Sequence, residues 1–361
     1  MTNSRFISVK KSDPQFYNYL LGNNQDGLRP IPVRSLNVGL EDEVITFEMK
    51  PVSEIKKPNI LEFIFGIAKI KSYLLIFLPL FFVLAKNLES SQIVDPFSLA
   101  FAAAAMIFTF AGLNMRNDIS DHVSGFDRVN ISSKPKPILA GWITANQLSK
   151  LSWIAIGFGV LFAVPVLLLQ FQIWKVLVCT GSLVLLGQFF QKNSYKEKDL
   201  GELILFLLMG IGIAVGFQVA FGVTIDIQIV AFGIFWGSVV LFLVHINNFG
   251  HLLTSTQAGI KNSITKLGFD RAKIFLAGWW SLCLILWTWF HFEFALSYWK
   301  WLGTLFLVVV SIPLFRKLSR VRSPLSSDLI QIRQHAYTLF LLLVFLFFVE
   351  HLCYLWSLWK L

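Results

Sequence analysis

The chain has 361 residues, of which 55% are hydrophobic and only 14% are charged, and its mean hydropathy is +0.65. A soluble globular domain carries about 25% charged residues, so this composition excludes an ordinary water-soluble protein and predicts an integral membrane protein. The formal net charge is +10. In a membrane protein such an excess of cations indicates orientation in the bilayer, and we expect no nucleic acid as a partner.

The first 60 residues differ in composition from the rest of the chain. They are polar, with scattered prolines and a short alternating run at Val44–Met49, and they match no motif. They also lack the apolar stretch of a signal peptide, so we expect no cleavage. We therefore divide the chain into a cytosolic extension of unknown role, residues 1–60, and a transmembrane domain, residues 61–361. The extension is predicted to be either a small cap or a loose tail.

The transmembrane domain contains nine apolar runs. A helix needs about 20 apolar residues to cross a bilayer, so these runs predict an all-α bundle of nine transmembrane helices. The runs are 61–85, 97–115, 152–171, 173–190, 202–222, 226–246, 271–292, 296–315 and 336–356. Lys69 and Lys71 interrupt the first run, and we expect them to reach the interface or to face a wet cavity.

Cations are distributed unequally between the two sides of this predicted bundle. Most of the 31 Lys and Arg residues fall in the N-terminal segment or in loops on its side. The opposite loops and the C-terminal tail carry only Lys86, Lys175, Lys300 and Lys360. This asymmetry predicts a multi-pass protein of the cytoplasmic membrane with its N-terminus in the cytoplasm and its C-terminus outside.

Polar residues cluster where the second predicted span ends. The stretch there reads Asn114-Met-Arg-Asn117-Asp118-Ile-Ser-Asp121-His-Val-Ser-Gly125-Phe-Asp127. Asn114, Asp118 and Asp121 share one face of a helix. We expect Gly125 to break this helix, so that the chain folds back and Asp127 joins the other carboxylates.

Three carboxylates at the inner end of a hydrophobic bundle require a cation, and oxygen ligands in this number suit Mg²⁺. Magnesium held by one or two carboxylates usually completes its shell with substrate phosphates. We therefore predict Asp118 and Asp121 as metal ligands, and Asp118, Asp121 and Asp127 as the catalytic candidates. The alternative is a solvated loop with ordinary acidic residues. The location, at the end of a span and within a basic loop, favours the metal site.

These residues carry a resemblance to a known family. Asn117-Asp118-x-x-Asp121-x-x-x-Gly125-x-Asp127 resembles the first aspartate-rich motif of the UbiA superfamily of intramembrane prenyltransferases, most closely the menaquinone-pathway branch that prenylates dihydroxynaphthoate. The run from Lys136 to Thr144 resembles the next family element, with Lys in place of Arg, and Leu200-Gly201-Glu202 resembles a third. The resemblance covers roughly residues 60–356. It implies substrate-binding roles for Asn114, Asn117 and Lys136.

The second aspartate motif of the family is altered in this chain. Asn247, Asn248 and Gly259 match it, but His251 and Ser255 stand where two carboxylates are expected. We expect Asn247, His251, Thr254 and Ser255 to share a helical face, which leaves a polar site without the charge for a second Mg²⁺. The further substrate-binding candidates are Asn247, Asn248, His251 and Lys261, with Lys261 as a direct contact to a diphosphate.

The resemblance implies a function. The expected reaction is transfer of a prenyl group from a polyprenyl diphosphate to an aromatic acceptor, similar to dihydroxynaphthoate or hydroxybenzoate, with Mg²⁺ as cofactor and the active site facing the cytoplasm. The altered second motif leaves open a catalytically inactive relative that binds an isoprenoid lipid or a partner. A transporter is the least favoured alternative, because the charges lie at the ends of the predicted spans rather than at mid-membrane.

Overall fold

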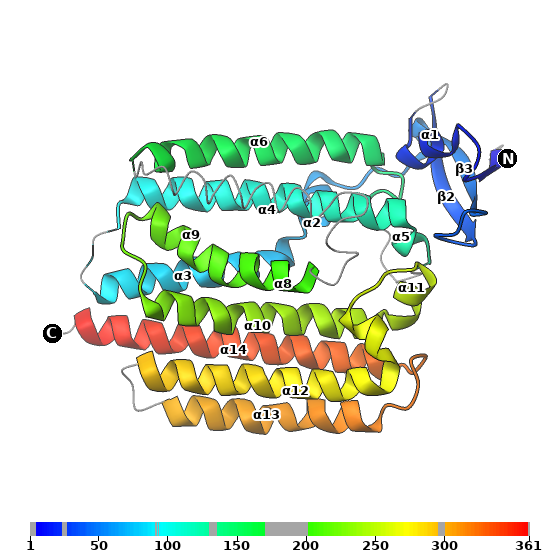
Figure 1. Cartoon of the computed structure of the whole chain (residues 1–361). Helices are drawn as coiled ribbons and strands as arrows, with labels where there is room; N and C mark the ends of the chain where they lie inside the picture. Colours follow the sequence, from blue (N-terminus) through cyan, green and yellow to red (C-terminus); the bar gives the residue numbers. More distant parts are fainter. Residues whose placement is uncertain are drawn as a thin grey trace.

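The computed structural model describes residues 5–23, 27–90, 92, 94–129, 136–169, 201–294 and 300–359. Long helices run side by side in one bundle, and a small sheet lies with a short helix, α1 (Phe16–Leu21), at one end of that bundle (Figure 1). The last helix ends at the opposite end of the bundle. The fold is therefore mostly helical, as predicted.

The N-terminal segment folds into a three-stranded antiparallel sheet. Its strands are β1 (Arg5–Lys10), β2 (Leu28–Leu36) and β3 (Val44–Pro51), in the order β1-β3-β2. Alternate residues of β3, Ile45, Phe47 and Met49, are buried against α1 and β1. The prediction of an all-α chain was thus wrong for this part. The alternating run at Val44–Met49 was the sequence signal of the strand, because its period of two suits a half-buried sheet.

The first predicted span, 61–85, is not one continuous helix. After a short 3-10 turn η1 (Val52–Glu54), the chain forms α2 (Ile60–Ala68), a second 3-10 turn η2 (Ile70–Tyr73) and α3 (Leu74–Glu89). Lys69 ends α2 in the left-handed conformation, with φ of 52°. This break shortens the apolar helix that follows, so the first of the nine predicted spans is replaced by two separate helices.

Seven helical segments of the described residues are long and apolar enough to cross a membrane. They correspond to seven of the nine predicted runs, and the fourth run, 173–190, lies outside the described residues. The remaining elements are α4 (Pro96–Ser124), α5 (Phe126–Val129), α6 (Ala145–Leu169), α8 (Gly201–Phe206), the π-helical turn η4 (Leu207–Gly212), α9 (Ile213–Ala220), α10 (Ile227–Gly250), α11 (Leu252–Gln257), α12 (Ser263–Phe294), α13 (Lys300–Arg320) and α14 (Asp328–Trp359).

Helix α10 lies in the centre of the bundle, where it is buried on nearly every side. Phe232 and Trp236 of this helix stack in parallel, and Phe82 of α3 stacks on Phe232 with ring centroids 4.0 Å apart. The backbone of η4 packs closely against α10. A Cβ added at Gly210 of η4 would lie only 2.7 Å from Gly237 Cα of α10, which is too close for a side chain. This rigid centre fixes the end of α10 at which the polar residues gather.

The polar segments gather at the end of the bundle that carries the sheet. Helices α5 and α11 and the connection from α13 to α14 all lie at this end (Figure 1). These are segments that the cation distribution assigned to one side of the membrane. The arrangement brings the two halves of the candidate site, the end of α4 and the end of α10, to the same end of the bundle.

Candidate functional site

The three aspartates of the first motif are buried at the end of α4. Asp118 and Asp121 lie one helical turn apart, 3% and 8% exposed. Gly125 ends the helix with φ of 88°, and the chain folds back into α5, which carries Asp127 at 4% exposure. The predicted helix break at Gly125 is therefore confirmed. The left-handed conformation there suits glycine, because it has no Cβ to clash with the backbone.

Lys136 lies among these three carboxylates. Its Nζ is 3.7 Å from Asp118 Oδ1 and 3.5 Å from Asp121 Oδ2, and it donates a hydrogen bond to Asp127 Oδ1. Burial lowers the pKa of the Lys136 ammonium, but the attraction of the carboxylates outweighs burial and raises that pKa above its ordinary value. Lys136 therefore stays charged and holds the three carboxylates together.

Burial disfavours the ionised form of Asp127. Burial raises its pKa to about 6, and the neighbouring Asp121 adds to that rise, whereas the charge of Lys136 opposes it. A buried carboxylate beside others titrates closer to neutrality than an exposed one. Asp127 is thus poised to gain or lose a proton near physiological pH.

A second cation, Lys69, reaches the cluster from the break between α2 and α3. Lys69 Nζ lies 2.7 Å from Asp118 Oδ1. Asn114 holds the turn around it, because Asn114 Nδ2 donates to Ala68 O at 3.1 Å and to Ser72 Oγ at 3.2 Å. The break in the first predicted span therefore places the Lys69 ammonium beside Asp118 instead of in the lipid.

The donor atoms of the cluster suit a hard cation. Asp118 Oδ1 is buried and accepts no hydrogen bond of normal geometry within the described part of the chain, although Lys69 Nζ is close. Asn117 Nδ2 donates to Asp121 Oδ2 at 3.1 Å and fixes that carboxylate. Among the described residues no three His, Cys, Asp or Glu side chains form a metal cage by themselves. A divalent ion here would therefore be held by Asp118 and Asp121 and completed by ligand oxygens, which fits Mg²⁺.

The second motif lies where α10 ends. His251 interrupts the helix between α10 and α11, so Asn247, His251 and Ser255 do not share one continuous helical face as expected. Asn247 and Asn248 are half-buried, and their carbonyl oxygens both accept from the His251 backbone N–H at 3.2 Å. Ser255 is buried in α11. This half of the site is polar, as predicted, but it is formed by a break between two helices and not by one continuous helix.

His251 is paired with a residue that the sequence did not single out. Arg333 Nη1 of α14 lies 3.0 Å from His251 Nε2. The ring of His251 also meets the edge of Phe126 at a centroid distance of 5.8 Å, and Lys136 Nζ lies 6.0 Å from the centre of that Phe126 ring. Phe126 and His251 thus link the Lys136 cluster to Arg333. Burial, Arg333 and Lys136 lower the pKa of His251, so its imidazole is neutral.

Two further predicted residues have other surroundings. Lys261 is exposed in the loop before α12, and the structure brings it to none of the three described carboxylates. Glu202 accepts a hydrogen bond from the Ser263 backbone N–H at 3.1 Å and another from the Ser263 hydroxyl. Glu202 therefore joins the start of α8 to the start of α12, which is a structural role at the edge of the site.

The N-terminal sheet packs directly against the first motif. Arg128 of α5 forms an ion pair with Glu43 at 2.6 Å, and both side chains are almost fully buried. His122 Nε2 donates to Leu20 O at 3.0 Å, and Arg128 Nε donates to Ser35 Oγ at 3.2 Å. We call residues 5–55 the cap. Of the two predictions for this segment, a small cap or a loose tail, the structure matches the first.

Comparison with known families identifies the helical part of the chain. The UbiA prenyltransferase family matches residues 76–343, which leaves the cap outside the match. No curated protein matches the sequence.

Solved structures share the fold at low sequence identity. A digeranylgeranylglyceryl phosphate synthase is 16% identical with a TM-score of 0.56, and the match covers 81% of this chain and 98% of that one. A UbiA homolog from Archaeoglobus fulgidus, bound to DMAPP and Mg²⁺, is 12% identical with a TM-score of 0.55, over 76% and 98% of the two chains. A UbiA homolog from Aeropyrum pernix K1 is 15% identical with a TM-score of 0.52, over 75% and 97%. At these identities the likeness shows a common fold.

Proposed function

Because the chain belongs to the UbiA prenyltransferase family, we propose that it transfers a prenyl group from a polyprenyl diphosphate to an aromatic acceptor in the membrane. The observation that carries the proposal is the buried group of Asp118, Asp121 and Asp127 around Lys136, with Asp118 Oδ1 left without a normal hydrogen bond. This group sits at the end of an apolar bundle. There it can meet the charged end of an amphiphile whose tail lies among the helices.

The proposed roles follow from the chemistry of each group. Asp118 and Asp121 would hold Mg²⁺, with Asn117 fixing the Asp121 carboxylate. When bound, Mg²⁺ neutralises the charge that develops on the departing diphosphate. Lys69 and Lys136 add fixed positive charge at the same place. Structures of a related protein support this assignment, since a UbiA homolog from Archaeoglobus fulgidus is described bound to DMAPP and Mg²⁺ and bound to GPP and Mg²⁺.

The reaction breaks the bond between the allylic carbon and the diphosphate oxygen, which keeps the electron pair. The allylic cation then forms a bond to an electron-rich ring carbon, and that carbon gives up a proton to the released diphosphate, which restores the aromaticity of the ring. Water would trap this cation, so an apolar surrounding is required. Buried side chains near the cluster, including Ile67, Met115 and Ile138, meet that requirement. Asp127 is our candidate for orienting the acceptor or completing the metal site.

We propose a dihydroxynaphthoate-like acceptor on the basis of the spacing of the first motif, with a hydroxybenzoate-like compound as the alternative. Either one would make this a step of quinone biosynthesis. The proposed membrane is the cytoplasmic membrane, with the cap and the carboxylates on the cytoplasmic side, and the distribution of cations supports this orientation.

A second candidate function is favoured by one observation. His251 and Ser255 stand where the family resemblance predicts carboxylates, and Arg333 adds positive charge beside His251. Such a chain can bind an isoprenoid diphosphate without transferring its prenyl group. We prefer the enzyme because all three aspartates of the first motif converge. The remaining alternative, a transporter, has less support since these charges lie at one end of the bundle.

The test is a titration of the protein in nanodiscs with farnesyl or geranylgeranyl diphosphate, with and without Mg²⁺. The wild type should bind in a Mg²⁺-dependent manner, and Asp118→Ala and Asp121→Ala should lose that dependence. Asp270→Ala is the matched control, because the Asp270 side chain is 86% exposed on α12. Binding that ignores Mg²⁺ and both substitutions would refute the proposal. A screen of aromatic acceptors for a prenylated product then separates the enzyme from the non-catalytic binder.

A further inference from the structure

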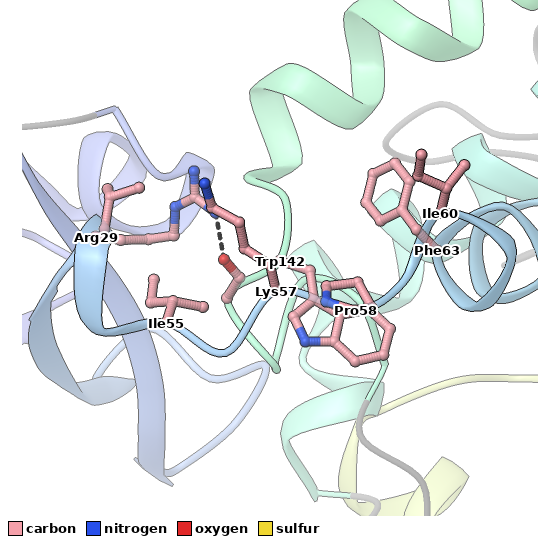
Figure 2. Close-up of a pocket in the computed structure, with 9 residues that line it drawn as sticks. Arg29, Ile55, Lys57, Pro58, Ile60, Phe63 and Trp142 are labelled. Atoms are coloured by element: carbon pink, nitrogen blue, oxygen red, sulfur yellow. Dashed lines mark hydrogen bonds between the residues drawn. The ribbon is translucent and has the colours of Figure 1, made fainter.

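A cavity of about 290 Å³ lies between the cap and the helical bundle, away from the aspartates. Figure 2 shows Arg29 of β2 on one side of it, Ile60 and Phe63 of α2 on the other, and Lys57 and Trp142 between them. The walls are mostly apolar, and none of the lining residues is acidic. The cavity therefore combines two cations with an apolar surface.

Arg29 is the unusual group in this cavity. Its side chain is 8% exposed, and its Nη1 donates to the carbonyl oxygen of Gly141, the contact drawn as a dashed line in Figure 2. Its Nε is buried and has no hydrogen-bond partner among the described residues. A buried guanidinium N–H is costly to leave unpaired, so this nitrogen favours a ligand with an acceptor oxygen, and the charge of Arg29 favours an anionic one. Lys57, exposed at the same cavity, supplies a second cation.

Helix α2 shows what surrounds the opening of the cavity. Ile60, Leu61, Ile64 and Phe65 of this short helix are all exposed, although they are large and apolar. The helix is also too short to cross a bilayer, at nine residues. A helix of this kind lies in the membrane interface with its apolar side chains among the lipids. The cavity at its first turn is therefore at the depth of the lipid headgroups.

We propose that this cavity binds the phosphate group of an anionic phospholipid. Arg29 and Lys57 pair with the phosphodiester, and the glycerol and first acyl carbons lie against Ile60, Phe63 and Trp142. An anionic headgroup is preferred over a zwitterionic one, because a choline or ethanolamine cation would meet two positive side chains. The lipid joins the cap to α2 and to the turn at Trp142. This inference does not depend on the proposed prenyl transfer.

Lipid binding can be measured by native mass spectrometry of the delipidated full chain, titrated with phosphatidylglycerol or with phosphatidylcholine. We expect the wild type to retain one phosphatidylglycerol. Arg29→Gln and Lys57→Gln should each weaken its retention roughly tenfold, because one charge-assisted contact is lost. Arg34→Gln, an exposed arginine on the same strand β2, is the control and should retain lipid as the wild type does.

Two further comparisons control for a change in folding and identify the source of the anion. Arg29 also holds Gly141, so Arg29→Gln can disturb the fold; Lys57 is exposed, and its substitution tests the charge without that risk. Retention in Lys57→Gln equal to the wild type would overturn the proposal, as would equal retention of phosphatidylcholine. Competition with inorganic phosphate distinguishes the source of the anion. If inorganic phosphate displaces the lipid at a concentration equal to that of the lipid, the site binds a free anion, and the proposal of a bound lipid is overturned.

Discussion

Arg333 of the last helix donates a hydrogen bond to His251, with 3.0 Å between Arg333 Nη1 and His251 Nε2. Since a guanidinium can only donate, the imidazole must accept at Nε2 and is neutral. His251, which stands in place of a carboxylate, is thus held by a cation that lies 82 positions further along the chain. Arg333 brings positive charge to the second half of the site, to which our proposal assigns no metal ion.

Replacement of Arg333 tests whether this charge contributes to binding of the diphosphate. Arg333→Gln is expected to weaken Mg²⁺-dependent binding of geranylgeranyl diphosphate roughly tenfold, since one charge-assisted contact to phosphate oxygens is removed. The measurement is the nanodisc titration, with Arg322→Gln, an exposed arginine just after α13, as the control. Equal affinity in the two variants would place Arg333 outside the diphosphate site.

Restoring a carboxylate at position 251 is the converse experiment. His251→Asp should form a charge-assisted pair with Arg333 and preserve or raise Mg²⁺-dependent prenyl transfer, because it returns the charge that the resemblance predicts there. His335→Asp, on an exposed position of α14, controls for the added negative charge. Loss of folding in His251→Asp alone would show that the imidazole is needed for the structure.

The neutral state of His251 also predicts a pH dependence of stability. Burial and the charges of Arg333 and Lys136 lower its pKa, and the carboxylate of Asp121 opposes them. The folded state therefore binds the proton less readily than the unfolded chain, whose histidines titrate near 6.5. The stabilisation is fully present above about pH 6.5 and is lost as the pH falls toward the lowered value. The Tm of the wild type should fall more than that of His251→Gln between pH 7 and pH 5; parallel curves would contradict this.

The buried ion pair between the cap and α5 predicts a large effect on stability. Glu43→Gln leaves the guanidinium of Arg128 buried without its anion and should destabilise the folded state by about 3 kcal/mol. Glu48→Gln is the matched control on the adjoining strand β3, because Glu48 pairs with Lys50 near the surface, at 3.0 Å, and such pairs contribute under about 1 kcal/mol. Thermal unfolding in one detergent measures both variants. A Glu43→Gln protein as stable as the Glu48→Gln protein would show that the cap is only loosely attached.

Much of the helical bundle could be predicted from hydropathy alone. Seven of the nine apolar runs correspond to long helices, since a run of about 20 apolar residues leaves few alternatives to a membrane-spanning helix. The break at Lys69 could have been inferred from the charge in the run, but its left-handed backbone and its contact to Asp118 depend on Asn114, which lies 42 to 46 residues away from its partners in sequence. Local patterns do not report such contacts.

The first half of the site was also predictable, and the second half was not. Asp118, Asp121 and Gly125 are close in sequence, so helical periodicity and the conformational freedom of glycine were enough to place them. The sequence assigned Arg333 only to the cations that orient the protein, whereas the structure places it in α14 beside His251. The sheet of the cap was not predicted, because a short alternating run in a membrane protein is a weak signal beside strong apolar runs.

The attachment of the cap has a consequence for how the chain is made. Arg29 and Leu20 are synthesised about a hundred residues before their partners Gly141 and His122. The sheet can form early, but its buried contacts cannot close until α4 has been inserted and the turn before α6 has returned to the same side. A chain in which only one of α3 and α4 crossed the bilayer would leave the cap and the carboxylates on opposite sides of it. The contacts of the cap, including the buried ion pair of Glu43 and Arg128, therefore close only when both helices have crossed.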